Sequence, residues 1–230
     1  MPKNVEKRRF MLIFIGRAMQ FLLALITIRV ATTLLSPAEM GKVALVLSTT
    51  AFFAFSLISP LGMFINRRLH AWVATGVAWY YLKFYVLYLA VVVIASSLCL
   101  MVLYKFASVD FGMTIGWLLL LVCGFLFFGT INQTVIPSLN LLGFSNWFVL
   151  LTLATMILSL GCAYVLTELF LQNAPYWILG ILIGQLVLAV VSSKVLFNQL
   201  KQQVVNFQPG NIHKQSVRVL FGFSWPLAIG

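Results

Sequence analysis

The chain has 230 residues, of which 62% are hydrophobic and 8% are charged, and its formal net charge is +11. Soluble domains carry about 25% charged residues, so this composition excludes an ordinary soluble protein. The basic residues form short clusters between apolar stretches, which is typical of cytoplasmic loops and argues against a surface that binds nucleic acid. We therefore predict an all-α integral membrane protein.

Six apolar runs are long enough to cross a bilayer, which takes about 20 mostly apolar residues in a helix. The first run is too long for the apolar part of a signal peptide, so we interpret it as an uncleaved transmembrane helix. A seventh run begins near Val219 and stops at Gly230 after a dozen residues, so we expect it to continue in a longer protein. The six complete runs are residues 10–35, 41–65, 84–104, 113–139, 145–170 and 175–198.

The positive charges predict the orientation of these spans. With the N-terminus in the cytoplasm, eleven Lys and Arg residues lie on the inner side, and only Lys42 and Lys105 lie on the outer side. Cytoplasmic loops carry such an excess of basic residues, so we predict a cytoplasmic N-terminus. The predicted domains are a six-helix lobe over 1–199, a cytoplasmic linker over 200–218, and the start of a seventh helix over 219–230.

Local signals mark a helix start and two kinks. Ser36 and Pro37 are typical of an N-cap and a first helical position, and Glu39 completes an S-x-x-E capping-box pattern. Pro60 and Pro137 lie inside predicted spans, where each is expected to kink its helix.

Residues for catalysis or metal binding are sparse. The four acidic residues are scattered, and neither histidine has an acid or a cysteine at ligand spacing. The three cysteines lie inside apolar segments, which is typical of buried free thiols. The sequon at 132–134 falls within a span, so we interpret it as a chance match. We expect no enzyme activity, no metal and no cofactor.

Two arginines lie inside the first predicted span, where an ionisable group is a candidate functional residue. At 100° per residue, Arg17 lies at the edge of a stripe of small and polar residues, and Arg29 lies on the opposite face. Such a stripe faces either a tightly packed neighbour or a water-filled cavity, and the presence of Arg17 favours the cavity. Arg29 could equally extend to the outer headgroups. The stripe consists of Gly16, Gln20, Ala24, Thr27 and Ala31.

A second, uncharged stripe occurs in the fifth predicted span. It consists of Thr152, Thr155, Ser159 and Cys162. Because it carries no charge, we expect it to pack against a neighbouring helix.

Four segments resemble one family. LLSPAEMGKVAL is similar to the first hairpin of the bacterial polysaccharide-biosynthesis membrane proteins, the O-antigen-type flippases of lipid-linked oligosaccharides, although Met40 stands where an aromatic residue is usual. ISPLGMFINRRL resembles the end of the family's second helix, LNLLGFSNWFVL its turn between helices four and five, and VRVLFGFSWPLAIG the start of its seventh helix.

The resemblance implies one lobe of a two-lobe transporter in the bacterial inner membrane. Its substrate would be an undecaprenyl-diphosphate-linked oligosaccharide, moved between leaflets by alternating access. Cationic residues hold the diphosphate in such proteins, which implies Arg17 and, at the inner mouth, Arg67 here, and Gln20 would contact the sugar. Thr27 and Arg29 are further candidate binding residues because of their positions in the first span. Polysaccharide polymerase or assembly proteins are implied partners, besides membrane lipids. Alternative functions are a cation-coupled exporter of small molecules, or a scaffold in a glycan-assembly complex.

Overall fold

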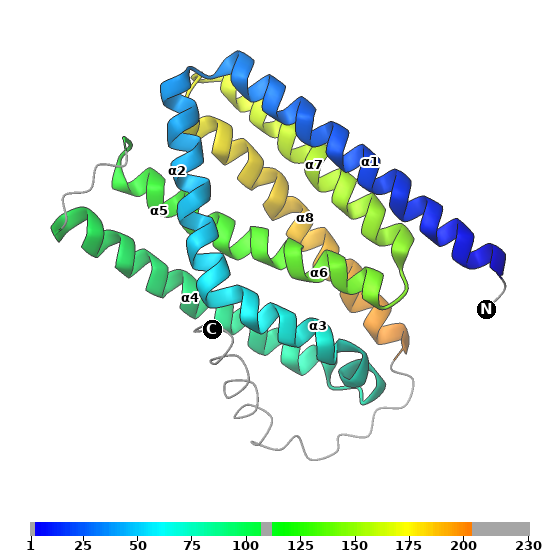
Figure 1. Cartoon of the computed structure of the whole chain (residues 1–230). Helices are drawn as coiled ribbons and strands as arrows, with labels where there is room; N and C mark the ends of the chain where they lie inside the picture. The colour runs from blue at the N-terminus through cyan, green and yellow to red at the C-terminus, as the bar shows by residue number, and fades with distance from the viewer. Residues whose placement is uncertain (1–2, 107–111, 204–230) are drawn as a thin grey trace.

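The computed structural model describes residues 3–106 and 112–203, and in this part of the chain all regular structure is helical (Figure 1). The predicted seventh span and most of the predicted linker lie outside the described residues. The elements, with η for a π-helical turn, are α1 (Lys3–Leu34), α2 (Pro37–Phe53), η1 (Ala54–Ile58), α3 (Ser59–Ala74), α4 (Ala78–Phe106), α5 (Ile115–Gly124), η2 (Phe125–Gly129), α6 (Thr130–Leu141), α7 (Ser145–Leu169) and α8 (Ala174–Gln203).

Within the described residues, six helices are long and apolar enough to cross a membrane, which confirms an all-α, multi-pass membrane protein. Two of these six are continuous helices that contain a π-helical turn: α2, η1 and α3 form the second, and α5, η2 and α6 form the fourth. The fifth agrees with its predicted limits to one residue, whereas the sixth extends to Gln203, past the expected domain boundary at 199.

The connection between the second and third spans differs from the sequence-based prediction. The predicted limits of the two spans leave residues 66–83 as an inner connection, but α3 continues to Ala74 and α4 begins at Ala78 after a tight turn. Gly76 supplies the positive φ of 73° that this turn requires. Hydropathy falls at Arg67 and Arg68, but α3 continues past them. Trp72 packs inward there, and its ring stacks on that of Tyr81 with 4.2 Å between the ring centres.

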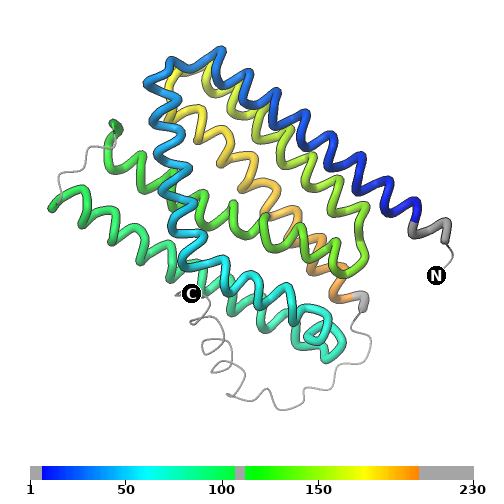
Figure 2. The backbone as a smooth tube through the Cα atoms, viewed as in Figure 1, coloured from blue at the N-terminus to red at the C-terminus, as the bar shows by residue number. Residues whose placement is uncertain are grey.

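The second span bends sharply, as the backbone tube in Figure 2 shows where α2 meets α3. The bend coincides with η1, and Pro60 follows directly at the start of α3. A proline removes one backbone donor and a π turn changes the helical register, so together they account for the predicted kink. In the fourth span the π turn η2 lies eight residues before Pro137, so this proline does not explain it.

The most extensive helix contact in the described chain joins α7 and α8. A Cβ at Gly180 would lie 2.3 Å from Ala163 Cα, and one at Gly184 would lie 2.5 Å from Ser159 Cα. Ser159 also donates a hydrogen bond to the Ile181 carbonyl. For Ser159, this contact confirms the prediction that the polar stripe of the fifth span packs against a helix.

The turn between α1 and α2 is attached to the turn between α7 and α8. Ser36 and Pro37 cap α2 as predicted, since Ser36 Oγ accepts the Glu39 N–H at 3.3 Å. The Glu39 carboxylate differs from a capping box, because its two oxygens accept from Lys42 Nζ at 2.6 Å and from the Ala174 N–H at 2.7 Å. Glu39 therefore connects the start of α2 to the start of α8.

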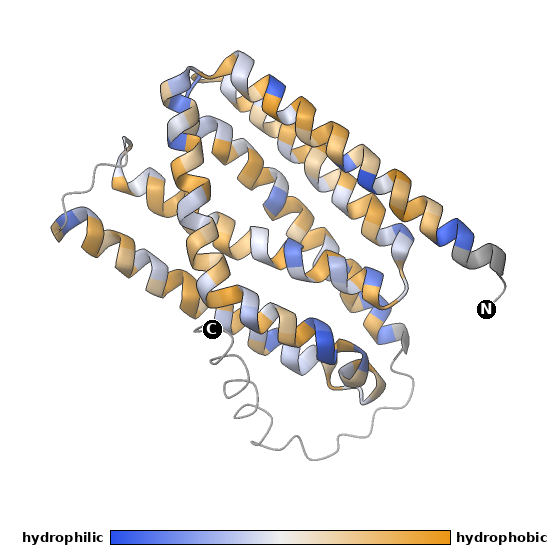
Figure 3. Ribbon diagram, viewed as in Figure 1, coloured by the Kyte–Doolittle hydropathy of each residue, from blue (hydrophilic) through white to orange (hydrophobic). Residues whose placement is uncertain are grey.

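Charged residues are distributed unequally between the two ends of the bundle. Figure 3 shows strongly hydrophilic residues at the start of α1 and towards the end of α3. One end, called the basic end below, holds the start of α1, the α3–α4 and α6–α7 turns and the end of α8 (Figure 1). Arg9 joins two of these parts by donating to the Gly143 carbonyl at 2.6 Å. The basic end carries Lys7, Arg8, Arg9, Arg67, Arg68, Lys83, Lys194 and Lys201.

Candidate functional site

Arg17 lies on α1 with its side chain exposed. Its guanidinium lies 5.4 Å from the centre of the Phe148 ring on α7, and its Nη1 donates to Gln20 Oε1 at 3.0 Å. The one salt bridge among the described residues joins Lys42 and Glu39, so Arg17 has no acidic partner there. Arg17 is thus a guanidinium on a membrane-spanning helix that is positioned by an aromatic ring and an amide.

The predicted polar stripe of α1 faces α7. Gly16 and Ala31 are buried, and a Cβ at Gly16 would lie 2.8 Å from Val149 Cγ1. The sequence left two alternatives for this stripe, a tightly packed neighbouring helix or a water-filled cavity. For Gly16 and Ala31, the packed neighbour is the one that the structure shows. Gln20 is different, because its Nε2 is buried and has no hydrogen-bond partner in the described structure.

The other predicted binding residues are separated from Arg17. Thr27 uses its hydroxyl to donate to the Leu23 carbonyl of its own helix at 2.8 Å. Arg29 is exposed nearer the opposite end of α1, and its carbonyl accepts from Thr32 and Thr33. Arg67 is exposed on α3, which lies across the bundle from α1 (Figure 1). The structure brings Arg17 and Gln20 together and leaves the other three residues apart.

A polar network inside the bundle was missed by the sequence analysis. Asn132 on α6 donates through Nδ2 to the Gln185 carbonyl on α8 at 2.8 Å, and its Oδ1 accepts from Ser192 Oγ at 3.2 Å. The side chains of Asn132 and Ser192 are buried. The signal in the sequence is the polar run TINQT within an apolar span, which contains more polar side chains than the chance sequon alone.

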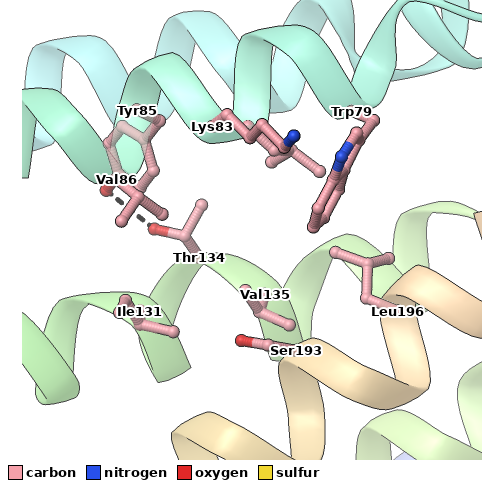
Figure 4. Close-up of a pocket in the computed structure, with 10 residues that line it drawn as sticks. Trp79, Lys83, Tyr85, Val86, Ile131, Thr134, Val135, Ser193 and Leu196 are labelled. Carbon is pink, nitrogen blue, oxygen red and sulfur yellow. Dashed lines mark hydrogen bonds between the residues drawn. The ribbon is translucent and has the colours of Figure 1, made fainter.

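A second interhelical hydrogen bond separates two pockets. Tyr85 on α4 and Thr134 on α6 are 2.9 Å apart between their hydroxyl oxygens, and both residues line each pocket. Figure 4 shows this hydrogen bond and the larger pocket. The larger pocket, about 280 Å³, is mainly apolar and lies between α4, α6 and α8. The smaller, about 160 Å³, lies beside η1 and α3 and includes Asn66, whose Oδ1 is buried without a partner in the described structure.

Neither pocket is lined by Arg17, Gln20, Thr27, Arg29 or Arg67. The fold and these sites define a multi-pass helical membrane protein with a cationic position on its first helix and polar groups within its bundle. Comparison with models of protein families, with curated proteins and with solved structures found no match to this chain.

Proposed function

We propose that this chain forms a six-helix lobe of a transporter for an undecaprenyl-diphosphate-linked oligosaccharide in the bacterial inner membrane. The observation on which the proposal depends is Arg17, an exposed guanidinium without an acidic partner among the described residues, on a helix able to span the membrane. A charged group is costly at such a position and is usually associated with function. The proposal places the N-terminus and the basic end on the cytoplasmic side of the membrane, as the excess of basic residues there predicts.

The surroundings of Arg17 suit an anionic ligand. Arg9 contacts the α6–α7 turn, and Arg17 lies eight residues further along α1, roughly 12 Å deeper. Phe148 covers one face of the guanidinium, and Gln20 occupies one of its donors. The remaining N–H groups can bind a phosphate in a bidentate manner, which a lysine ammonium cannot reproduce.

The distribution of acids favours this function over a cation-coupled exporter. Coupling by protonation usually requires a carboxylate within the membrane. Glu39 lies in the first turn of α2 and Glu168 in the last turn of α7, both at the ends of their helices. These are the acidic residues whose side chains the structure describes.

Arg17→Ala is expected to reduce transport about tenfold or more, because a hydrogen-bonded ion pair contributes roughly 1.5–3 kcal/mol. Arg17→Lys should retain part of the activity, since it keeps the charge but loses the bidentate geometry. The measurement is the amount of surface polysaccharide in cells producing each variant, normalised to the amount of protein in the membrane. Arg8→Ala, at the exposed start of α1, is the matched control. If Arg17→Ala reduces only the amount of protein, Arg17 is a structural residue and the proposal is wrong.

Access of water to the Arg17 region can be measured by cysteine labelling. The starting variant has Cys99, Cys123 and Cys162 replaced by alanine. If water reaches the region around Arg17, a cysteine introduced at Gln20 should react with a membrane-impermeant thiol reagent. A cysteine at Leu22, which is 51% exposed on the apolar surface of α1, should remain unlabelled because it faces lipid. Equal labelling at the two positions would contradict an aqueous path beside Arg17.

A further inference from the structure

Two contacts between helices lie on either side of the larger pocket. At one end, the hydroxyls of Tyr85 and Thr134 join α4 to α6. At the other end, the rings of Trp79 and Phe197 lie 4.8 Å apart and join α4 to α8. The space between these two contacts is the pocket of about 280 Å³ (Figure 4).

The walls of this pocket extend from the bundle surface to its core. Trp79, Lys83 and Val86 are exposed, whereas Leu82 and Leu196 are buried. Leu82, Val86 and Leu196 line the pocket together with Ile131 and Val135. A surface opening that leads to an aliphatic interior suits a hydrocarbon chain, which gains by leaving polar surroundings and loses no hydrogen bond.

A cation lies at the exposed side of the same pocket. Lys83 is five residues into α4, roughly 8 Å from the start of the helix, and its ammonium lies 5.3 Å from the centre of the Trp79 ring. Tryptophan and lysine at this depth are typical of the level of the lipid headgroups. No salt bridge to Lys83 occurs among the described residues.

The surrounding charges also favour an anion. Lys83 belongs to the basic end, and α8, which forms one wall of the pocket, carries Lys194 and Lys201 towards the same end. Glu39 and Glu168 lie at the opposite end of their spans. Basic positions between transmembrane helices commonly bind anionic lipid headgroups.

We propose that the pocket between α4, α6 and α8 binds an anionic phospholipid, with one acyl chain against Val86, Ile131 and Val135 and the phosphate at Lys83. An apolar wall and a single cation together select a lipid over free phosphate, which would leave the aliphatic surface empty. The proposal is independent of the transport substrate and of Arg17. Its physical consequence is that the lipid fills the space between three helices of the bundle.

The experiment counts lipids bound to the full chain by native mass spectrometry. Protein in mild detergent is incubated with phosphatidylglycerol or phosphatidylcholine that carry identical acyl chains. The unaltered protein should retain more phosphatidylglycerol, and Lys83→Gln should lower that retention about fivefold, the effect of one basic residue near an anionic headgroup. Lys105→Gln, at the other end of α4, is the matched control and should change retention little.

A second variant tests the pocket itself. Val135→Phe should fill the cavity and reduce phosphatidylglycerol binding even with Lys83 present, whereas Val91→Phe, on the exposed side of α4, should not. Ser193→Leu fills the same cavity and serves if Val135→Phe does not fold. Millimolar inorganic phosphate should fail to displace the lipid.

Three results would overturn the proposal. If Lys83→Gln and Lys105→Gln lower retention equally, the anion preference reflects overall charge. If Val135→Phe and Ser193→Leu both fold and both leave phosphatidylglycerol bound, the lipid lies outside this pocket. Displacement by inorganic phosphate would likewise show an anion site without an acyl chain.

Discussion

Gly180→Ala and Gly184→Ala are each expected to destabilise the protein by about 2 kcal/mol, because either methyl group would collide with the backbone of α7. The Cβ of each alanine would lie within 2.5 Å of a backbone Cα atom, at Ala163 or at Ser159. Overpacking of this kind costs about 3 kcal/mol, and the higher helix propensity of alanine offsets about 1 kcal/mol of it. The two helices would have to separate along the most extensive contact in the described chain.

The measurement is the midpoint of unfolding in detergent, by heat or by titration with a denaturing detergent. Gly161→Ala on α7 is the matched control, since a Cβ there meets nothing within 4 Å. Gly161→Ala should be neutral or slightly stabilising because alanine is the better helix former. An equal loss of stability in all three variants would show that close approach of α7 and α8 is not the cause.

Glu39→Ala is expected to destabilise the protein by about 2 kcal/mol, because it removes the connection between the α1–α2 turn and α8. The carboxylate accepts the backbone N–H of Ala174, the first residue of α8, and also pairs with Lys42. A hydrogen bond to a charged group contributes roughly 1.5–3 kcal/mol, and a negative charge at a helix N-terminus is favourable in addition. Glu39→Gln keeps an acceptor but no charge, so its effect should be smaller.

Glu168→Ala provides the comparison for Glu39. Glu168 lies exposed in the last turn of α7, and a surface change of this kind is usually within about 0.5 kcal/mol. Hydrogen exchange should show the difference locally, with faster exchange in the first turn of α8 for Glu39→Ala only. Unchanged exchange at Ala174 in Glu39→Ala would contradict the connection between the two turns.

Several features of the protein could be predicted from residues close together in the chain. The six spans follow from hydropathy, since each helix satisfies its own backbone hydrogen bonds and needs only enough apolar length. The start of α2 follows from Ser36 and Pro37, because an N-cap involves neighbours within one turn. The kink in the second span could be predicted from Pro60, because a proline disturbs the hydrogen bonds of its own helical turn.

Other features depend on partners that are distant in the sequence. Helical periodicity placed Gly16 and Gln20 on one face of α1 but did not say what that face contacts. The pattern G-x-x-x-G at Gly180 and Gly184 indicates close helix packing, although it does not identify α7 as the partner. The TINQT run likewise indicated a polar group inside the fourth span, although not its partners on α8.

The sequence by itself determined an all-α membrane protein with six spans and its basic residues gathered towards one end. Hydropathy and charge act along each segment separately, so they need no knowledge of neighbouring helices. The tertiary structure alone decided that α1 packs on α7, that Glu39 reaches Ala174, and that Lys83 borders a pocket between α4, α6 and α8. These contacts depend on the rotation and crossing of helices, which side-chain packing between distant residues sets.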